Sequence, residues 1–354
     1  NDNTPAGSRQ AVANPRHLDI HLVEAHETRR IVDRLYGFPV SQVLWMKIGQ
    51  GAKSAGRVQS VAVRLVVDRE RERIAFRSAD YWDIVGVFAP GAFDAKLSSV
   101  DGVRIASGTD FDQQGALKKD SVTLLDETRA RALVGGLTGA TFVVRSVVQK
   151  PSQRQPKAPF ITSTLQQEAS NRLRWGGQRT MRVAQSLYEN GYITYMRTDS
   201  VSLSEQAVTA ARSQARELYG PEYVPEGPRR YASKVKNAQE AHEAIRPAGD
   251  VFRTPGEVSG ELNPDEFALY DLIWKRTVAS QMVNAQVATT TVKLGTHTTD
   301  GTDVEFSASG TVVVFPGFYA ALKDVAEDSD DDDRERELPN LAEGDALVNA
   351  MPWL

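Results

Sequence analysis

The sequence contains no cysteine, and this absence excludes several kinds of site at once. Its 354 residues include 0 Cys and 5 His. Without thiols the chain can form neither a disulfide framework nor a thiolate zinc site, so a metal would need oxygen or imidazole ligands. Long apolar runs are also missing, and no stretch reaches the roughly 18 residues that suggest a membrane span. Because residues 1–7 lack signal-peptide character too, we expect a cytoplasmic location and no membrane contact.

Net positive charge, which would point to a nucleic-acid partner, is missing as well. The formal net charge is −4. Residues 324–337, however, carry nine acidic and two basic side chains, and without this segment the remainder of the chain is at +3. A DNA-binding surface is therefore compatible with the composition. With 41% hydrophobic and 25% charged residues over 354 positions, we expect a globular protein of two or three domains.

The most informative stretch that is present is residues 191–200, Gly-Tyr-Ile-Thr-Tyr-Met-Arg-Thr-Asp-Ser. If these residues form a strand, Tyr195 and Arg197 share one face while Thr194 and Met196 point away. A free tyrosine has a pKa near ~10, so a nucleophilic tyrosine needs positive charge beside it. Arg197 could supply that charge and clamp a phosphate. Without further context, a half-buried strand tyrosine beside a solubilising arginine is the commoner meaning of such a triplet.

The flanks of this stretch place it between two helices. Residues 180–190 have helical spacing, and Asn190-Gly191 is a typical left-handed helix stop. Downstream, residues 202–205 (Ser-Leu-Ser-Glu) read as a capping box that opens the next helix. Backbone N–H groups at that helix start would lie close beyond Arg197, where a phosphate is favoured.

A second group of polar residues lies on a helix expected over residues 56–75. Arg57, Arg64 and Asp68 fall within roughly 40° of one line on such a helix, so Asp68 can orient Arg64. Four residues form an apolar stripe beside them and predict that this side is packed: Val58, Val61, Ala62 and Leu65. A surface ion pair worth only a few tenths of a kcal/mol is the alternative for Arg64 and Asp68.

Two further pairs are spaced four apart. Arg30 and Arg34, on a helix expected over residues 17–36, could touch consecutive phosphates or be solvated helix charges. His242 and Arg246 belong to His-Glu-Ala-Ile-Arg, which lacks the second histidine of a helical zinc pair. On a helix both could instead meet one phosphate, although a capping or core histidine is the alternative.

The order of expected elements predicts one β-rich unit interrupted by a helical one. After the two early helices, the first of which should end at Gly37 and Pro39, β-type runs cover residues 81–88, 93–100 and 141–148, with a helix at 127–134. The polar, proline-containing residues 150–157 read as a linker. A mainly helical region follows to about residue 284, and strands return at 287–294, 304–308 and 312–315.

Three of these segments together resemble bacterial type IA DNA topoisomerases of actinobacterial type: residues 191–200, residues 54–60 (Ser-Ala-Gly-Arg-Val-Gln-Ser) and residues 241–247 (Ala-His-Glu-Ala-Ile-Arg-Pro). They occur in the family's order through nearly the whole chain. The resemblance implies an enzyme that cuts one DNA strand through a tyrosine, holds the 5′-phosphate covalently, passes a strand and reseals, relaxing negative supercoils without ATP. It places the nucleophile at Tyr195 and a phosphate contact at Arg197.

The resemblance also implies which residues contact single-stranded DNA. The matching positions line the strand groove or lie near the scissile phosphate, and Arg30 and Arg34 join them from their spacing. The expected DNA-binding residues are Arg30, Arg34, Ser54, Ala55, Gly56, Arg57, Val58, Gln59, Arg64, Asp68, Gln185, Glu189, His242 and Arg246.

For the fold, the resemblance implies a multidomain α+β protein. Residues 1–80 would be a helical segment of the base domain, 81–155 and 284–354 the two parts of a β-rich arch, and 156–283 an inserted, mainly helical domain that carries the tyrosine. The family's Toprim domain, whose acidic residues bind magnesium, precedes the matched region. We therefore expect Mg²⁺ in the intact enzyme, no metal bound by these residues, and a monomeric chain that cannot relax DNA alone.

Two other readings remain open from the sequence. Residues 162–200 could form a helix-turn-helix module that binds duplex DNA without catalysis. A tyrosine recombinase is the other, but there the arginine and His-x-x-Arg elements precede the nucleophile, whereas His242 and Arg246 follow Tyr195 with a different spacing.

Overall fold

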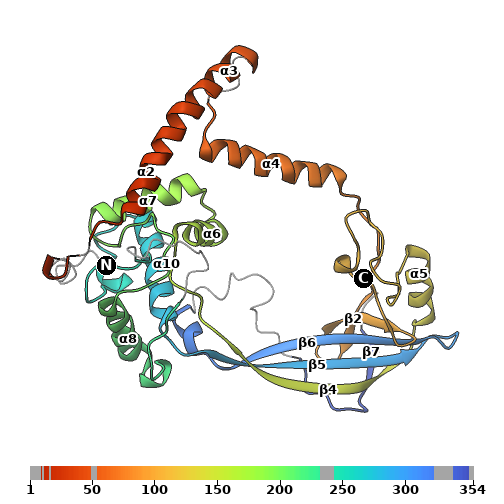
Figure 1. The fold of residues 1–354 in the computed structure, drawn as a ribbon. Helices are drawn as coiled ribbons and strands as arrows, with labels where there is room; N and C mark the ends of the chain where they lie inside the picture. The colour runs from red at the N-terminus through yellow and green to blue at the C-terminus, as the bar shows by residue number, and fades with distance from the viewer. Residues whose placement is uncertain are drawn as a thin grey trace.

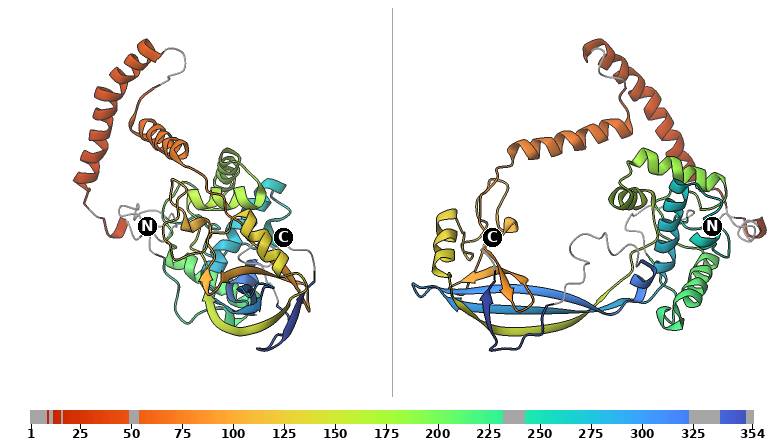
Figure 2. Two further views of the ribbon diagram at one scale, coloured as in Figure 1. Left: turned by 90° about the vertical axis from the view of Figure 1, so that its right-hand side faces the viewer. Right: turned by 180° about the vertical axis from the view of Figure 1, so that it is seen from behind.

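The structure is a computed structural model that describes residues 9, 12–15, 17–48, 54–231, 243–322 and 338–350. Its ribbon outlines an open ring: three helices run along the top, a helical lobe forms one end, and long strands run along the bottom to the other end (Figure 1). The view from behind shows the same separation of the two ends (Figure 2, right). His242 and the acidic residues 324–337 lie outside the described residues.

The top of the ring is formed by α2 (Ile20–Val32), a π-helical turn η1 (Asp33–Gly37), α3 (Phe38–Ile48) and α4 (Arg57–Ala75). The predicted end of the first helix at Gly37 and Pro39 is wrong, because the chain stays helical through both. Proline cannot donate an intrahelical hydrogen bond, and the wide turn immediately before Pro39 changes the hydrogen-bond register where that donor is missing.

The apolar side chains of α4 are exposed. On α4 the side chains of Val58, Val61 and Leu65 are 75%, 57% and 66% exposed, and no residue of the helix is buried. The predicted stripe therefore exists, whereas the predicted packing is wrong for the described residues. Sequence periodicity identifies an apolar face, but it cannot show whether another part of the chain covers it.

The bottom of the ring is a single antiparallel sheet. It contains β1 (Val85–Ala89), β2 (Phe93–Val100), β3 (Val103–Arg104), β4 (Thr141–Arg154), β5 (Ala285–His297), β6 (Asp303–Phe315) and β7 (Ala346–Asn349). The strand order is β1-β7-β4-β5-β6-β2-β3, and an additional β1–β2 pairing closes the sheet into a barrel. Helix α5 (Glu127–Gly136) lies at the far end, and η2 (Gly108–Asp110) is a short 3₁₀ turn.

Two predicted features of these strands need correction. Residues 304–308 and 312–315 belong to one continuous strand, β6. The predicted linker at residues 150–157 begins too early, because β4 continues to Arg154 and Pro151 pairs with Ala288. Proline is tolerated there because β7 pairs only with Thr141–Val143, so the rest of β4 has a neighbour on one side only.

Aromatic side chains form the centre of the barrel. Phe88, Phe142 and Phe306 are each 0% exposed. The Phe142 ring meets those of Phe88 and Phe306 edge-on, with centroids 4.9 Å and 5.6 Å apart. Such contacts add to the burial of large apolar surfaces, so this cluster holds the strands in register.

The helical lobe lies between β4 and β5 in the sequence. It contains α6 (Thr162–Leu173), α7 (Gly177–Glu189), α8 (Glu205–Tyr219), η3 (Pro221–Tyr223), α9 (Pro255–Val258) and α10 (Pro264–Ser280). Its separate core includes Leu165, Leu187, Ala211 and Ile273, all 0% exposed. The expected α+β class, with a helical unit inserted into a β-rich one, is therefore confirmed.

One segment after the lobe returns to it. The 3₁₀ helix η4 (Gly317–Leu322) follows β6, yet Phe318 and Ala321 belong to the core of the helical lobe. The proposed domain boundaries stay a prediction, and this packing shows that the second β segment also contributes to the helical core. None of the helices in the described ranges is long and apolar enough to cross a membrane.

We predict that Phe142→Ala destabilises the barrel by about 3–5 kcal/mol, because it removes a fully buried aromatic side chain and leaves a cavity. The neighbouring Val143, 44% exposed on the other face of β4, is the matched control. Val143→Ala should change stability by about 0.5 kcal/mol or less. Urea unfolding followed by circular dichroism measures both; equal losses would show that the barrel core lies elsewhere.

Candidate active site

Tyr195 lies in an irregular loop, not in the predicted strand. Between α7 and α8 only an isolated antiparallel bridge from Ile193 to Pro247 is formed. The predicted alternation is nevertheless present, since Met196 is 3% exposed whereas Tyr195 is 45% exposed and Arg197 is also exposed. Tyr195 and Arg197 therefore project outward while Met196 is held in the core.

The first turn of α6 holds this loop on one side. The Thr162 hydroxyl donates to the Met196 carbonyl over 2.8 Å and accepts from the Thr198 N–H over 3.0 Å. The Thr162 N–H also donates to the Thr198 carbonyl over 3.0 Å. Because these bonds satisfy the backbone on both sides of Arg197, the extended conformation needs no neighbouring strand.

The opposite side of the loop is held by residues 243–249. The Thr194 N–H donates to the Arg246 carbonyl over 2.9 Å, and the Ala248 N–H donates to the Tyr192 carbonyl over 2.9 Å. At the start of the loop, the Tyr192 hydroxyl donates to Glu261 over 2.8 Å. The Arg253 guanidinium and this hydroxyl lower the pKa of Glu261 to about 2.

Helix α7 presents one polar face beside the tyrosine. The Tyr188 ring meets the Tyr195 ring edge-on, with centroids 5.2 Å apart. One turn away, Gln185 donates to Glu189 over 2.8 Å, and both side chains are exposed. The structure thus brings Gln185 and Glu189 to the helix that contacts Tyr195. Sequence analysis did not single out Tyr188, because its contact with Tyr195 depends on how the loop after α7 folds back.

A cavity of about 410 Å³ opens beside Arg197. Within the described part of the chain no hydrogen bond or ion pair of Arg197 is found. The cavity also includes the start of α6, so a cation and a helix N-terminus border the same space. Its lining residues are Ile161, Thr162, Ser163, Gln166, Arg197, Thr198 and Asp199.

The capping box predicted at residues 202–205 is wrong by two positions. The N-cap of α8 is Ser204, whose hydroxyl accepts from the Ala207 N–H over 3.3 Å. The Ser204 N–H donates to the Glu243 carboxylate over 2.8 Å, so a residue distant in sequence takes the place of the expected Glu205.

The predicted Arg64–Asp68 pair on α4 is present. Arg64 Nε lies 2.5 Å from the Asp68 carboxylate, and both side chains are solvent-accessible. Arg57, expected on the same line, instead forms a bidentate pair with Asp33 over 2.8 Å and 2.9 Å. This pairing raises the pKa of Arg57 and lowers that of Asp33. Helical spacing does not indicate Asp33 as its partner, because the two residues lie 24 positions apart.

The segment from Ser54 to Gln59 joins α4 to the preceding helices. The Ala55 N–H donates to the Ser41 hydroxyl over 2.9 Å, and Gln59 donates to Ser54 over 2.9 Å. Gly56 lies so close to the Gln59 amide that a Cβ there would come within 2.8 Å of it. Val58 is exposed on the first turn of α4.

The remaining residues expected to contact DNA differ in their exposure to solvent. Arg30 and Arg34 are both exposed, and Arg34 lies 5.7 Å from the Phe38 ring. The predicted helix is absent at Arg246, since residues 243–249 are not helical, and the Arg246 side chain is 2% exposed. The motif match therefore placed a buried arginine among the expected phosphate contacts. His242 lies outside the described residues.

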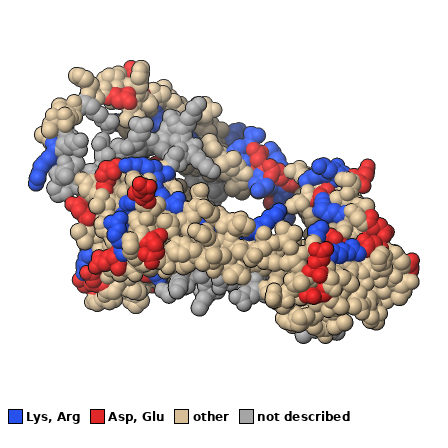
Figure 3. All heavy atoms as spheres, turned by 90° about the horizontal axis from the view of Figure 1, so that it is seen from below, with Lys and Arg blue, Asp and Glu red and all other residues tan. Residues whose placement is uncertain are grey.

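Charge is unevenly distributed over the molecule. Seen from below, charged side chains of both signs gather at the two ends, whereas the face formed by the long strands is mostly uncharged (Figure 3). Residues 285–292 of β5 and 307–315 of β6 contain no charged side chain. These parts of β5 and β6 therefore offer no cations for phosphates. No group of three or more His, Asp or Glu able to hold a metal is found among the described residues.

Comparison with known proteins identifies the class. The model of the DNA topoisomerase family Topoisom_bac matches residues 17–351, so the chain belongs to this family. It is 60% identical over 351 residues to DNA topoisomerase 1 of Streptomyces coelicolor and 56% identical over 354 residues to that of Mycolicibacterium smegmatis. These alignments cover 96% of the chain but only 37% and 38% of the relatives.

A solved structure gives the same assignment. Full-length topoisomerase I from Thermotoga maritima superposes with a TM-score of 0.72 at 35% sequence identity. The similarity covers 99% of this chain and 52% of the Thermotoga chain. The resemblance stated from the sequence is therefore confirmed, and the chain spans well under two thirds of the relatives that it matches.

We predict that Arg64 and Asp68 act as one unit in DNA binding, because Asp68 fixes the guanidinium. Arg64→Ala should weaken single-stranded DNA binding and reduce the slope of log K against log salt by about 0.7. Adding Asp68→Ala should then change little. Fluorescence anisotropy at several salt concentrations measures this. Arg69→Ala, which breaks an exposed pair with Glu72 on the same helix, is the control; a double-mutant loss equal to the sum of the single losses contradicts the prediction.

Proposed function

We propose that this chain provides the DNA-cleaving tyrosine of a type IA DNA topoisomerase, and that the tyrosine is Tyr195. The observation that carries the proposal is an exposed Tyr195 followed two positions later by an exposed Arg197, in a chain that belongs to a DNA topoisomerase family. The loop is supported by hydrogen bonds from two sides. A nucleophile held in this way loses little conformational freedom on reaction.

In the proposed reaction the Tyr195 oxygen attacks the phosphorus of a DNA phosphodiester. A bond forms between the tyrosine oxygen and phosphorus, and the bond between phosphorus and the 3′-oxygen breaks. The tyrosine proton leaves and the 3′-oxygen gains a proton, so one DNA end carries a 5′-phosphotyrosine and the other a 3′-hydroxyl. One phosphodiester replaces another, so resealing by the reverse step needs no ATP. A strand passed through the gap before resealing would relax negative supercoils.

Arg197 is proposed to bind the phosphate during this step. Charge grows on the non-bridging oxygens in the transition state, and a guanidinium can donate two hydrogen bonds to them. The 410 Å³ cavity beside Arg197 is large enough for a phosphate and part of a nucleotide. Gln185 and Glu189, on the helix that contacts Tyr195, are proposed to contact the same strand.

The cofactor and the remaining parts of the enzyme are proposed to lie outside these residues. The described residues contain no group of three or more His, Asp or Glu suited to magnesium, and Mg²⁺ is proposed to bind in a Toprim domain of the intact enzyme. We propose that the 354 residues are a central portion of that enzyme and are monomeric. Alone they are proposed to bind single-stranded DNA, through the α4 residues above together with Arg30 and Arg34. They are not expected to relax plasmids by themselves. We do not favour the helix-turn-helix module or the tyrosine recombinase, since the match to the DNA topoisomerase family extends over residues 17–351.

Tyr195→Phe should abolish covalent attachment to DNA because it removes the attacking oxygen, while binding stays nearly unchanged. The test mixes the chain with the N-terminal portion of the Streptomyces relative, magnesium and labelled single-stranded oligonucleotide, and looks for a complex that survives denaturation. Tyr188→Phe, which keeps the neighbouring ring but removes its hydroxyl, should still form the adduct. An adduct in the Tyr195→Phe protein would assign the nucleophile to another residue.

Arg197→Ala should slow cleavage much more than it weakens binding. Removing one donor that acts in the transition state costs about 3–4 kcal/mol, which corresponds to about 10²–10³ in rate. Loss of one phosphate contact changes affinity far less at moderate salt. Single-turnover cleavage and anisotropy, measured in the same reconstituted mixture, separate the two effects. Equal losses in rate and affinity would make Arg197 a docking residue only.

A further inference from the structure

We infer that Glu243 and Arg246 form a buried positioning pair that holds the Tyr195 loop in its reactive shape, an inference that rests on the proposed role of Tyr195. The Glu243 and Arg246 side chains are only 10% and 2% exposed, whereas Tyr195 and Arg197 are exposed. Their role is to fix the backbone from which those two side chains project.

The guanidinium of Arg246 donates four hydrogen bonds to other groups of the protein. Arg246 Nε and Nη2 donate to the two oxygens of Glu243 over 2.8 Å and 2.9 Å. Arg246 Nη1 donates to the carbonyls of Pro247 and Gly249 over 2.8 Å and 2.9 Å. At 2% exposure, the side chain cannot reach a phosphate in this arrangement. It therefore acts within the protein, fixing the shape of residues 243–249.

The backbone of Arg246 holds the start of the tyrosine loop. Its carbonyl accepts from the Thr194 N–H over 2.9 Å, and its N–H donates to the Thr194 hydroxyl over 3.0 Å. That hydroxyl donates in turn to the Ala244 carbonyl over 2.8 Å. The residue directly before Tyr195 is thus bound at both its backbone and its side chain.

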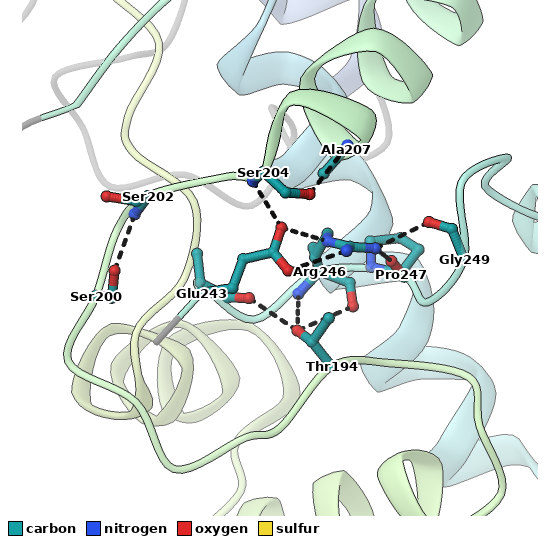
Figure 4. A network of polar contacts seen from close by, with 10 residues as sticks. Thr194, Ser200, Ser202, Ser204, Ala207, Glu243, Arg246, Pro247 and Gly249 are labelled. Carbon is teal, nitrogen blue, oxygen red and sulfur yellow. Dashed lines mark hydrogen bonds and ion pairs between the residues drawn. The ribbon is translucent and has the colours of Figure 1, made fainter. Parts of the chain in front are cut away.

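Glu243 holds the other end of the same loop. Its carboxylate accepts from the N–H of Ser204, the N-cap of α8, over 2.8 Å. Next to it, the Ala244 N–H donates to the Ser202 carbonyl over 2.8 Å. Figure 4 shows Glu243 and Arg246 lying between Ser204 on one side and Thr194 on the other. One ion pair therefore connects both ends of residues 194–204, which carry Tyr195 and Arg197.

The pair is also sensitive to change, because both charges are removed from water. The Glu243 and Arg246 side chains are 10% and 2% exposed. Removing one charge leaves the other buried without a partner. Replacing the forked guanidinium by a lysine keeps the charge but not the four directed hydrogen bonds. Arg246→Lys should therefore loosen the loop without removing the charge.

The first measurement uses the chain alone. In Arg246→Lys, hydrogen exchange in peptides covering residues 192–198 should become about ten-fold faster or more, while α10 keeps its protection. Arg172→Lys is the matched control, since Arg172 pairs with Glu168 over 2.5 Å in the same lobe with side chains only 22% and 14% exposed. Glu243→Asp, which keeps the buried charge but shortens the reach to Arg246 and Ser204, is the second variant if Arg246→Lys does not fold, and the same rise in exchange is expected.

The second measurement uses the reconstituted mixture with the N-terminal portion of the Streptomyces relative. The single-turnover cleavage rate of Arg246→Lys should fall about 10- to 100-fold, because the attacking oxygen is no longer held in line. The Kd for single-stranded oligonucleotide should change by less than about two-fold, since no phosphate contact is lost. A purely stabilising role would lower the melting temperature without separating rate from affinity.

Each outcome decides the inference. Faster exchange confined to the loop, with slower cleavage and unchanged affinity, supports it. Three results would overturn it: hydrogen exchange that rises equally in all peptides, cleavage no slower than in Arg172→Lys, or a cleavage rate and a DNA affinity that fall together. If the unmodified mixture forms no adduct, the proposed function fails, whereas the exchange data still show whether the pair holds the loop.

Discussion

The pairing of β4 with β5 is the constraint on which the architecture depends. The chain leaves the barrel along β4 and returns along β5, and the two strands pair from Val143 with Gly295 to Arg154 with Ala285. Whatever folds between these strands must begin and end at neighbouring points. The helical lobe satisfies this condition with its own core, and η4 returns to that core after β6. The position of Tyr195 relative to the barrel therefore depends on the β4–β5 ladder, together with the return of η4 to the helical core.

The tyrosine loop shows how an irregular segment becomes well defined. It has no strand partner, but Thr162 holds its middle and residues 243–249 hold its ends. Because a loop of this kind gains its shape from specific long-range hydrogen bonds, its side chains can remain exposed for chemistry while its backbone stays satisfied. Such support would suit the nucleophile role proposed for Tyr195, because the attacking oxygen would lose little freedom on reaction.

The sequence predicted those features that depend on local periodicity or on a recognisable motif. The class of fold, the helix before Tyr195, its end at Asn190-Gly191 and the ion pair of Arg64 with Asp68 were predicted in this way. Features set by residues distant in the chain were not: the pairing of Arg57 with Asp33, the Ser204 cap completed by Glu243, and the burial of Arg246. Spacing within a motif indicates which residues are neighbours on one element, but it carries no information about partners from elsewhere.

The Arg57–Asp33 pair has a consequence for how DNA binding by this chain would respond to electrolyte. The pair is solvent-accessible and ties α4 to the turn between α2 and α3. Interactions between exposed charges weaken as the Debye length shrinks, to about 8 Å at 0.15 M ionic strength. Added salt would therefore weaken DNA binding in two ways. It would screen the phosphates from the arginines, and it would weaken the ion pair that holds α4, the helix that carries Arg64, at its angle to the other helices. The apparent number of released counterions would then exceed the number of arginines that touch the strand.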